Sequence, residues 1–113
     1  MKELKYYDIN DNIEYDIIIG KNAQENWNII DKANKNDYWF HIDKFPSCHV
    51  ILTVHENIKP YKSVLYYCAN LCKENSKYKN NKNVKINYTQ IKNITKAEIV
   101  GSVYLKSSKT IKV

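Results

Sequence analysis

Apolar and polar residues alternate along residues 13–19, and the apolar positions share one face: Ile13, Tyr15, Ile17 and Ile19. This period of two predicts a half-buried strand, which Gly20 ends. The period then changes to about 3.6, and Asn22 and Glu25 have the spacing of a capping box, so a helix is predicted at about residues 22–33. The polar, charged stretch 34–37 is interpreted as a loop.

Two β-favouring runs follow this loop. The aromatic run at 38–42 predicts a strand, and residues 45–47 predict a turn. The nearly continuous apolar run at 49–54 predicts a central strand that is covered on both faces. The middle of the chain is therefore expected to contribute two neighbouring strands to one sheet.

The second half opens with the most regular helical pattern in the chain, carried by Val64, Leu65, Cys68, Leu71 and Cys72. It predicts a helix at 61–76, with Pro60 placed as a first helical residue. A basic loop at 76–83, a strand at 84–88 and a connection at 89–95 come next. Residues 99–105 and 110–113 are interpreted as a closing hairpin around 106–109, in which Gly101 marks a bulge or a close backbone approach.

These elements predict one α+β domain over residues 1–113, with a mixed, mostly antiparallel sheet of about six strands and two main helices. The chain opens without the apolar region of a signal peptide, and no stretch approaches the roughly 20 apolar residues of a membrane span. Three sparse cysteines, Cys48, Cys68 and Cys72, lack CxxC spacing and favour reduced thiols. We therefore expect a cytoplasmic protein without membrane association, metal or cofactor.

Charge divides unevenly between the two halves of the chain. Residues 1–56 carry six Lys and ten acidic residues, whereas residues 57–113 carry twelve Lys and two acidic residues, and the chain has no Arg. Such an asymmetry indicates a polyanionic partner. The lysines that fall in or beside the predicted loops form three groups: Lys77, Lys79 and Lys82; Lys92 and Lys96; and Lys106, Lys109 and Lys112. If these loops share one edge of the sheet, they form a basic groove, with Tyr78 available to stack on a base.

Two histidines lie on the two central strands, which a short turn joins, so His41 and His49 are expected to be neighbours. Three interpretations stay open: hydrogen-bonded anchors of the turn, together with Ser47; contacts to a ligand; or an acid–base pair. The anchor role is favoured, because the chain offers no clear nucleophile, metal motif or glycine-rich phosphate loop. For Trp39 and Tyr88, a place in the core is favoured over a base-stacking surface.

The order of several landmarks resembles the NFACT-R domain family, the RNA-binding-type domain of the NFACT proteins. The residues that carry the resemblance are Asn22, Asp37, Trp39, His41, Ser47, His49, Ser76, Lys77, Tyr88, Thr89 and Gly101. Most specific is the tryptophan–aromatic–histidine strand followed by the serine–x–histidine–valine strand. The resemblance covers roughly residues 13–113 and is nearest to the stand-alone members of the coiled-coil-domain 25 type.

This resemblance implies a non-catalytic module that binds nucleic acid. RNA is expected, either tRNA or ribosomal RNA in ribosome-associated quality control, although DNA stays open. The expected contact residues are Lys77, Lys79, Lys82, Lys92, Lys96, Lys109, Tyr78, His41 and His49. Lys neutralises phosphate but lacks the planar fork of Arg, so modest sequence specificity is expected.

Two alternatives remain open at this point. The first is a protein-interaction module that docks on a ribosome-associated factor. Its contact face would be the acidic first half, with Glu14, Asp16, Asp31, Asp37 and Asp43. The second is a hydrolase that uses His41 and His49.

Overall fold

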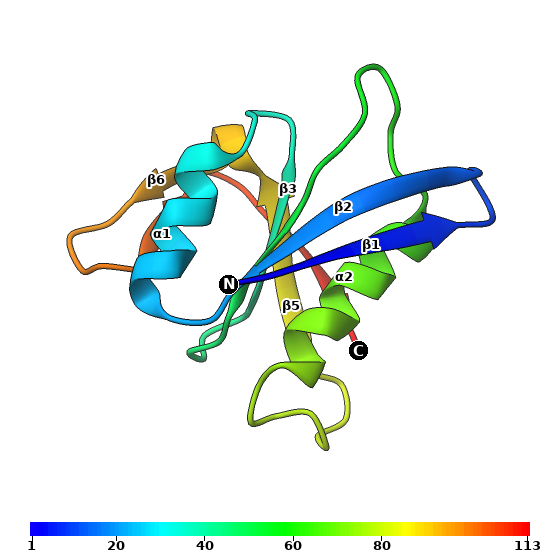
Figure 1. Cartoon of the computed structure of the whole chain (residues 1–113). Coiled ribbons are helices and arrows are strands. Elements are labelled where there is room, and N and C mark those ends of the chain that lie inside the picture. The colour runs from blue at the N-terminus through cyan, green and yellow to red at the C-terminus, as the bar shows by residue number, and fades with distance from the viewer.

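The computed structural model describes residues 1–113 and contains two α-helices and eight strands (Figure 1). The strands are β1 (Lys2–Asp8), β2 (Ile13–Gly20), β3 (Tyr38–Ile42), β4 (His49–Leu52), β5 (Lys85–Gln90), β6 (Ile94–Lys96), β7 (Val103–Leu105) and β8 (Lys109–Lys112). The helices are α1 (Ala23–Lys32) and α2 (Lys62–Glu74), and a short 3-10 turn spans Ile91–Asn93. Neither α-helix is long and apolar enough to cross a membrane.

Six strands form one sheet in the order β1-β2-β4-β3-β5-β8, and every neighbouring pair is antiparallel. Strands β6 and β7 form a separate two-stranded sheet. The α+β class, the six-stranded sheet and the two main helices agree with the sequence prediction. The sheet is more uniform than expected, because it contains no parallel pair.

The two helices lie on opposite faces of the large sheet, α1 on one side and α2 on the other (Figure 1). Since side chains of a strand alternate between faces, neighbouring residues of the central strands join different cores. Trp39 and Ile51 pack with Ile29 of α1, whereas Phe40 and Val50 belong to the larger core on the α2 side. All four residues of β4 are buried, which confirms the expectation that this strand is covered on both faces.

The apolar face of β2 is turned to the larger core, where Tyr15, Ile17 and Ile19 are fully buried. The strand β1 was not predicted, yet it pairs with β2 along its whole length from Lys2 to Asp8. Its sequence is rich in charge because it lies at the edge of the sheet, where exposed charged side chains discourage pairing with another chain. Because β1 carries the charged residues that suit an edge position, the sequence pattern did not reveal it as a strand.

The predicted closing hairpin is wrong. Strand β7 pairs with β6, which begins inside the predicted connection 89–95, and β8 instead pairs with β5 at the edge of the large sheet. The apolar residues separate in the same way, because Val103 and Leu105 pack on the α1-side core and Ile111 joins the α2-side core. An alternating pattern identifies strands but does not state which core receives each of them.

The prediction that Pro60 is a first helical residue is also wrong. The helix α2 begins at Lys62, and Tyr61, the N-cap, still has an extended backbone with a ψ of 157°. The chain therefore turns into the helix only after Tyr61, and Pro60 lies before the cap. The N-cap of α1 is as predicted, since the side chain of Asn22 accepts a hydrogen bond from the backbone N–H of Glu25 at 2.9 Å.

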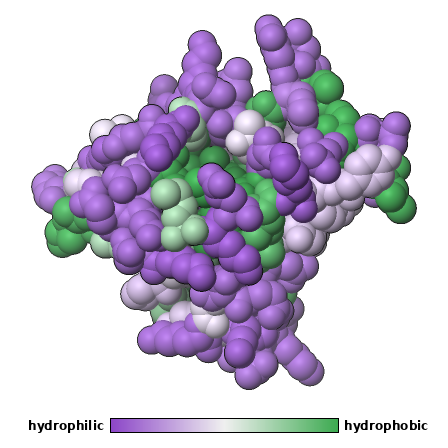
Figure 2. Space-filling view, viewed as in Figure 1, coloured by the Kyte–Doolittle hydropathy of each residue, from purple (hydrophilic) through white to green (hydrophobic).

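One face of the molecule is mostly hydrophilic, with an apolar hollow at its centre (Figure 2). This hollow lies between α1 and the strands β1 and β2, and Leu4, Ile18, Ile29 and Ile51 contribute to its lining. A different depression, at the end of the sheet near the β3–β4 turn, is lined by eight of the eleven residues that carry the family resemblance.

Candidate nucleic-acid interface

A cleft of about 920 Å³ lies on the α1 side of the sheet, where four segments meet. They are the start of α1, the β3–β4 turn, the loop that follows α2, and the 97–102 loop with the adjoining strand β7. We call it the α1-face cleft. Its lining includes eight residues of the sequence resemblance: Asn22, Trp39, His41, Ser47, His49, Ser76, Lys77 and Gly101.

The floor of the α1-face cleft is built on a hydrogen bond between two buried side chains. The indole N–H of Trp39 donates to Nδ1 of His49 at 3.0 Å, and the two residues are 1% and 2% exposed. Burial, together with the nearby His41, lowers the pKa of His49 to about 3. His49 is therefore neutral at physiological pH. The core position expected for Trp39 is confirmed.

His41 lies beside this pair, as the short turn predicts. Its ring is stacked on Trp39 with an interplanar angle of 8°, and meets the ring of His49 edge-on at a centroid distance of 5.1 Å. Burial lowers the pKa of His41, although the Ile42 backbone and the charge of Asp43 oppose the shift. Ser47 anchors the turn as suggested, because its Oγ accepts a hydrogen bond from the Ile42 N–H and donates to the Cys48 carbonyl.

Helix α1 is fixed against the cleft by Asn26. The Oδ1 of this buried side chain accepts a hydrogen bond from the backbone N–H of His49 at 3.2 Å. Gly20 makes room for the contact, since a Cβ at this position would lie 2.4 Å from the Asn26 Oδ1. Gly20 at the end of β2 and Asn26 near the start of α1 thus hold the start of β4 in place.

The 97–102 loop forms another wall. Gly101 has a φ of +88°, and a Cβ there would lie 2.9 Å from the Cα of Ala23. The close backbone approach suggested by the sequence is therefore present. Trp27 fixes the same loop, because its indole N–H donates to the carbonyl of Ser102 at 3.0 Å.

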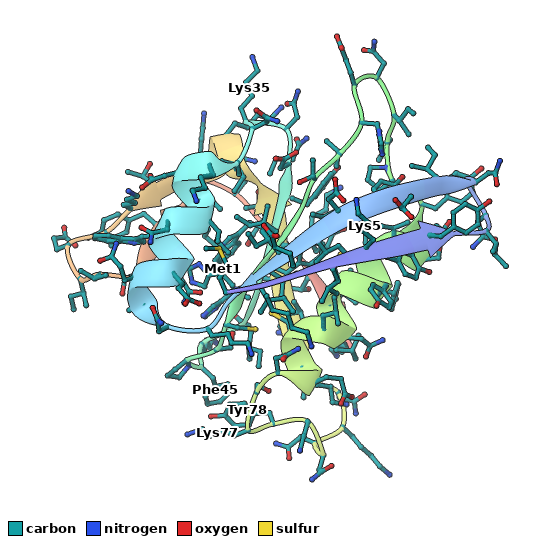
Figure 3. The ribbon with its side chains drawn as sticks, viewed as in Figure 1. Met1, Lys5, Lys35, Phe45, Lys77 and Tyr78 are labelled. Atoms are coloured by element: carbon teal, nitrogen blue, oxygen red, sulfur yellow. The ribbon has the colours of Figure 1, made fainter.

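The loop after α2 brings Lys77 to the rim. Ser76 Oγ donates to the Lys73 carbonyl and accepts from the N–H of Tyr78, which fixes the chain on both sides of Lys77. The ring of Tyr78 packs against Phe45 of the β3–β4 turn at a centroid distance of 5.0 Å. Figure 3 shows Phe45, Lys77 and Tyr78 together at this end of the molecule.

The charged residues that line the α1-face cleft are all cationic. Among its 21 lining residues are three lysines, Lys21, Lys44 and Lys77, and no Asp or Glu. All three lysines are exposed. Asp43, whose charge acts on His41, lies outside this lining, and its carboxylate accepts a hydrogen bond from Nδ2 of Asn87 at 2.8 Å. The cleft is thus an uncharged, partly apolar floor with a cationic rim.

The lysines expected from the sequence do not line one common cleft. Lys77 lies at the α1-face cleft, and Lys79 and Lys82 are exposed farther along the same loop. Lys96 forms an ion pair with Asp31 at 2.6 Å, and Lys92 is exposed on the 3-10 turn.

Lys109 lines a second depression on the α2 side of the sheet, together with Lys59, Lys62 and Tyr88. No carboxylate lines this depression either. Tyr88 also packs on the α2-side core, with its ring stacked on Phe40 at a centroid distance of 5.8 Å. The favoured core position of Tyr88 is therefore only partial, because one side of the residue contributes to the depression.

Two further residues that carry the family resemblance, Asp37 and Thr89, are buried and make hydrogen bonds that support the fold. Asp37 is buried, and its carboxylate accepts backbone hydrogen bonds from Asn34 and Val54. Thr89 is buried and its hydroxyl accepts a hydrogen bond from Asn93. Both side chains hold loops to the ends of strands.

The cysteines form no metal site, and no group of three His, Cys, Asp or Glu side chains is placed to hold a metal ion. All three cysteines are buried and unpaired by disulfides. Burial raises the pKa of the Cys68 thiol, and the contact with Cys48, together with burial, raises that of Cys72.

Sequence reasoning did not select Lys21, Lys44 or Asn26. Each had a local signal: Lys21 precedes the α1 N-cap, Lys44 lies in the β3–β4 turn, and Asn26 is a polar residue on the apolar side of a helix. These signals carry no weight until the fold places the three residues around the histidines.

An antiparallel sheet between two helices, with a lysine-rimmed cleft that contains no carboxylate, defines a small α+β domain with a surface suited to a polyanion. Comparison with known proteins identifies the family to which this domain belongs. Residues 4–109 match the model described as the NFACT protein RNA binding domain. The chain belongs to this family and is a nucleic-acid-binding module.

Several relatives share the name coiled-coil domain-containing protein 25. The chain is 39% identical over 106 residues to the protein from Bos taurus, which corresponds to 88% of this chain and 50% of the relative. It is 36% identical over 106 residues to the protein from Danio rerio, covering 86% of this chain and 50% of that relative. The chain thus spans about half the length of these relatives.

A solved structure has the same fold. It is the C-terminal part of the fibronectin/fibrinogen-binding protein from Streptococcus suis, with a TM-score of 0.83 and 28% sequence identity. The match covers 100% of this chain and 45% of that chain.

Proposed function

We propose that this chain binds RNA without catalysing a reaction, and that the α1-face cleft is its main contact surface. The observation that carries the proposal is the one-sided lining of the cleft, with three lysines and no carboxylate. Twelve acidic residues occur in the chain, so their exclusion from this surface favours a polyanion. Lysines that neutralise phosphates release condensed counterions, which supplies sequence-independent affinity.

The rest of the Lys-rich second half extends this surface. Lys79 and Lys82 continue from Lys77 along the same loop, and they would meet phosphates on either side of a segment held in the cleft. The depression around Lys109 offers a second contact for a larger RNA. A folded RNA such as tRNA or ribosomal RNA could reach both faces, which fits a role in ribosome-associated quality control in the cytoplasm.

The non-catalytic part of the proposal rests on the state of the histidines. A general base needs a free ring nitrogen, but Nδ1 of His49 is already occupied by the indole N–H of Trp39. The carboxylate of Asp43, whose charge acts on His41, accepts a hydrogen bond from Asn87. This arrangement supports the favoured structural role for His49, and it leaves the other ring nitrogen of His49 open to a ligand.

Binding to fluorescently labelled RNA, followed by anisotropy at low salt, tests the proposal. Lys77→Glu is expected to weaken binding by about tenfold or more, since it removes one phosphate contact and adds a repulsive charge. Lys35→Glu is the matched control, because Lys35 is also exposed and lies at the opposite end of the molecule (Figure 3). Equal losses in the two variants, or no binding by the unaltered chain, would contradict the proposal.

The acidic residues that suggested docking on a protein give this alternative little support in the structure. Asp31 is paired with Lys96 and Asp16 with Lys5, while Asp37 is buried. Much of the acidic surface is therefore balanced within the chain. A complex isolated with the tagged protein distinguishes the two functions: loss of its components after nuclease treatment supports RNA binding, and their retention supports docking on protein.

A further inference from the structure

The tautomer of His49 is fixed by its surroundings. Because Nδ1 accepts the indole N–H of Trp39, the proton of the neutral ring must lie on Nε2. Burial disfavours the charged form of the ring, so His49 keeps this single tautomer at neutral pH. The residue therefore presents one N–H donor in a constant direction.

This donor faces the α1-face cleft. His49 lines the cleft although only 2% of the residue is exposed. Every fully buried side-chain nitrogen or oxygen has a hydrogen-bond partner, whereas the hydrogen bonds of the His49 ring involve Nδ1 alone. Nε2 is consequently the part of the ring that reaches the cleft, and its N–H is available to a ligand acceptor.

The floor and the rim of the α1-face cleft suit different parts of a ligand. Its walls include the apolar side chains of Phe45, Val103 and Leu105, and its floor is the neutral pair of Trp39 and His49. A phosphate would lose its hydration at this floor without a cation beside it, which is costly. A nucleobase is uncharged, flat and rich in hydrogen-bond acceptors, so it suits the floor, and its phosphate suits the lysine rim.

We propose that the α1-face cleft is a pocket for an unpaired nucleotide of RNA. A carbonyl or ring-nitrogen acceptor of the base receives the Nε2–H of His49, and the adjoining phosphate lies against Lys77. This inference rests on the proposed RNA binding and narrows it. Only a base outside a duplex can enter, because a stacked and paired base has its face and its pairing edge covered. The cleft volume of about 920 Å³ falls in the range of roughly 300–1,000 Å³ that is typical of small-ligand sites.

Two RNA probes of nearly equal charge test the inference. One is a blunt duplex of about 14 base pairs, and the other is the same duplex with a central bulge of about three unpaired nucleotides. The unaltered chain is expected to bind the bulged duplex about tenfold more tightly than the blunt one, which corresponds to the contribution of a stacked and hydrogen-bonded base.

The variant His49→Asn separates the base contact from the lysine rim. Asn places an acceptor near the position of Nδ1, so Trp39 keeps its partner, but the Nε2–H is lost. The preference for the bulged duplex is expected to disappear, whereas affinity for the blunt duplex stays within about twofold. Lys77→Gln, the comparison variant, is expected to weaken binding to both probes and to retain the preference.

The outcomes distinguish this inference from the function on which it rests. If both probes bind equally well to the unaltered chain, or if His49→Asn keeps the preference, the nucleotide pocket is overturned while RNA binding stands. If neither probe binds at low salt, RNA binding itself fails. Should His49→Asn not fold, imidazole ¹H–¹⁵N spectra of the unaltered chain decide: addition of the bulged duplex must shift the His49 Nε2–H, and an unchanged signal contradicts the inference.

Discussion

At the scale of the residue, the most informative contact joins Trp39 to His49. A tryptophan in a core needs a partner for its N–H, and here the partner is an imidazole that burial keeps neutral. The contact satisfies a buried donor and sets the direction of a second donor at the same time. One hydrogen bond thus links the stability of the sheet to the chemistry of the cleft.

This link predicts a dependence of stability on pH. The pKa of His49 is lowered in the folded chain to about 3, whereas an unfolded histidine titrates near 6.5. Below about pH 6.5 the unfolded chain binds a proton that the folded chain does not, so the free energy of unfolding falls as the pH falls. The slope approaches about 1.4 kcal/mol per pH unit.

Urea unfolding at pH 7 and at pH 5 measures this effect, because carboxylates change little in that interval. The variant His49→Asn should lose part of the pH dependence and keep the part that arises from His41, whose pKa is lowered in the same direction. If the free energy of unfolding falls equally between pH 7 and pH 5 in the unaltered chain and in His49→Asn, His49 does not carry the effect.

Gly101 provides a second prediction at this scale. Gly101→Ala places a Cβ about 2.9 Å from the Cα of Ala23 at a residue with a φ of +88°. Because neither the clash with backbone nor the left-handed conformation can relax easily, the free energy of unfolding should fall by about 1–3 kcal/mol. Ser107→Ala, in an exposed loop outside the α1-face cleft, should change it by less than about 0.5 kcal/mol in the same thermal or urea experiment.

At the scale of the element, α1 is the helix that shapes the cleft. Its N-cap is Asn22, and Glu25 in its first turn accepts a hydrogen bond from the N–H of Lys21. The next residue, Asn26, holds the start of β4. The beginning of the helix therefore controls both the lysine at the rim and the histidine in the floor.

Asn22→Ala tests this role. Loss of the cap should lower the free energy of unfolding by about 1 kcal/mol and also weaken RNA binding, because Lys21 and the wall formed by Gly101 depend on the same helix start. Gln24→Ala, an exposed change in the same turn, is the control and should leave binding unaltered. A stable Asn22→Ala variant with full affinity would separate the helix start from the RNA surface.

At the scale of the whole molecule, charge is sorted by surface as well as by position along the chain. The acidic first half supplies Lys21 and Lys44 to the cleft, while the basic second half supplies Lys77. Two of the rim lysines thus come from the half that is negative overall. Some of the remaining acids are paired away from the cleft, such as Asp16 with Lys5 and Asp31 with Lys96.

The salt dependence of RNA affinity reports how many of these lysines contact phosphate. For a single strand, the slope of log affinity against log salt is about −0.7 per neutralised phosphate. Changing Lys44 and Lys77 to Gln should make the slope less steep by about 1.4 in total, whereas Lys35→Gln should leave it unchanged. A slope that does not respond to the cleft lysines would place the phosphate contacts elsewhere.

The sequence by itself determined the period of most elements. Residues 13–19, 38–42 and the apolar stripe from Val64 to Cys72 fold locally as their spacing predicts, since the alternation of apolar residues states which face must be buried. The sequence also determined the domain class and, through an ordered set of residues, the family. The charged strand β1 was concealed because an edge strand needs charge for protection.

Only the tertiary structure decided which strands pair and which side chains meet. The pairing of β7 with β6, and of β8 with β5, depends on two cores of similar apolar character that a pattern cannot distinguish. The fold also separated Lys96 and Lys109 from the α1-face cleft and brought Lys21 and Lys44 to it. Contacts between residues far apart in the sequence are chosen by the packing of the whole chain, so the site exists only once the two cores have formed.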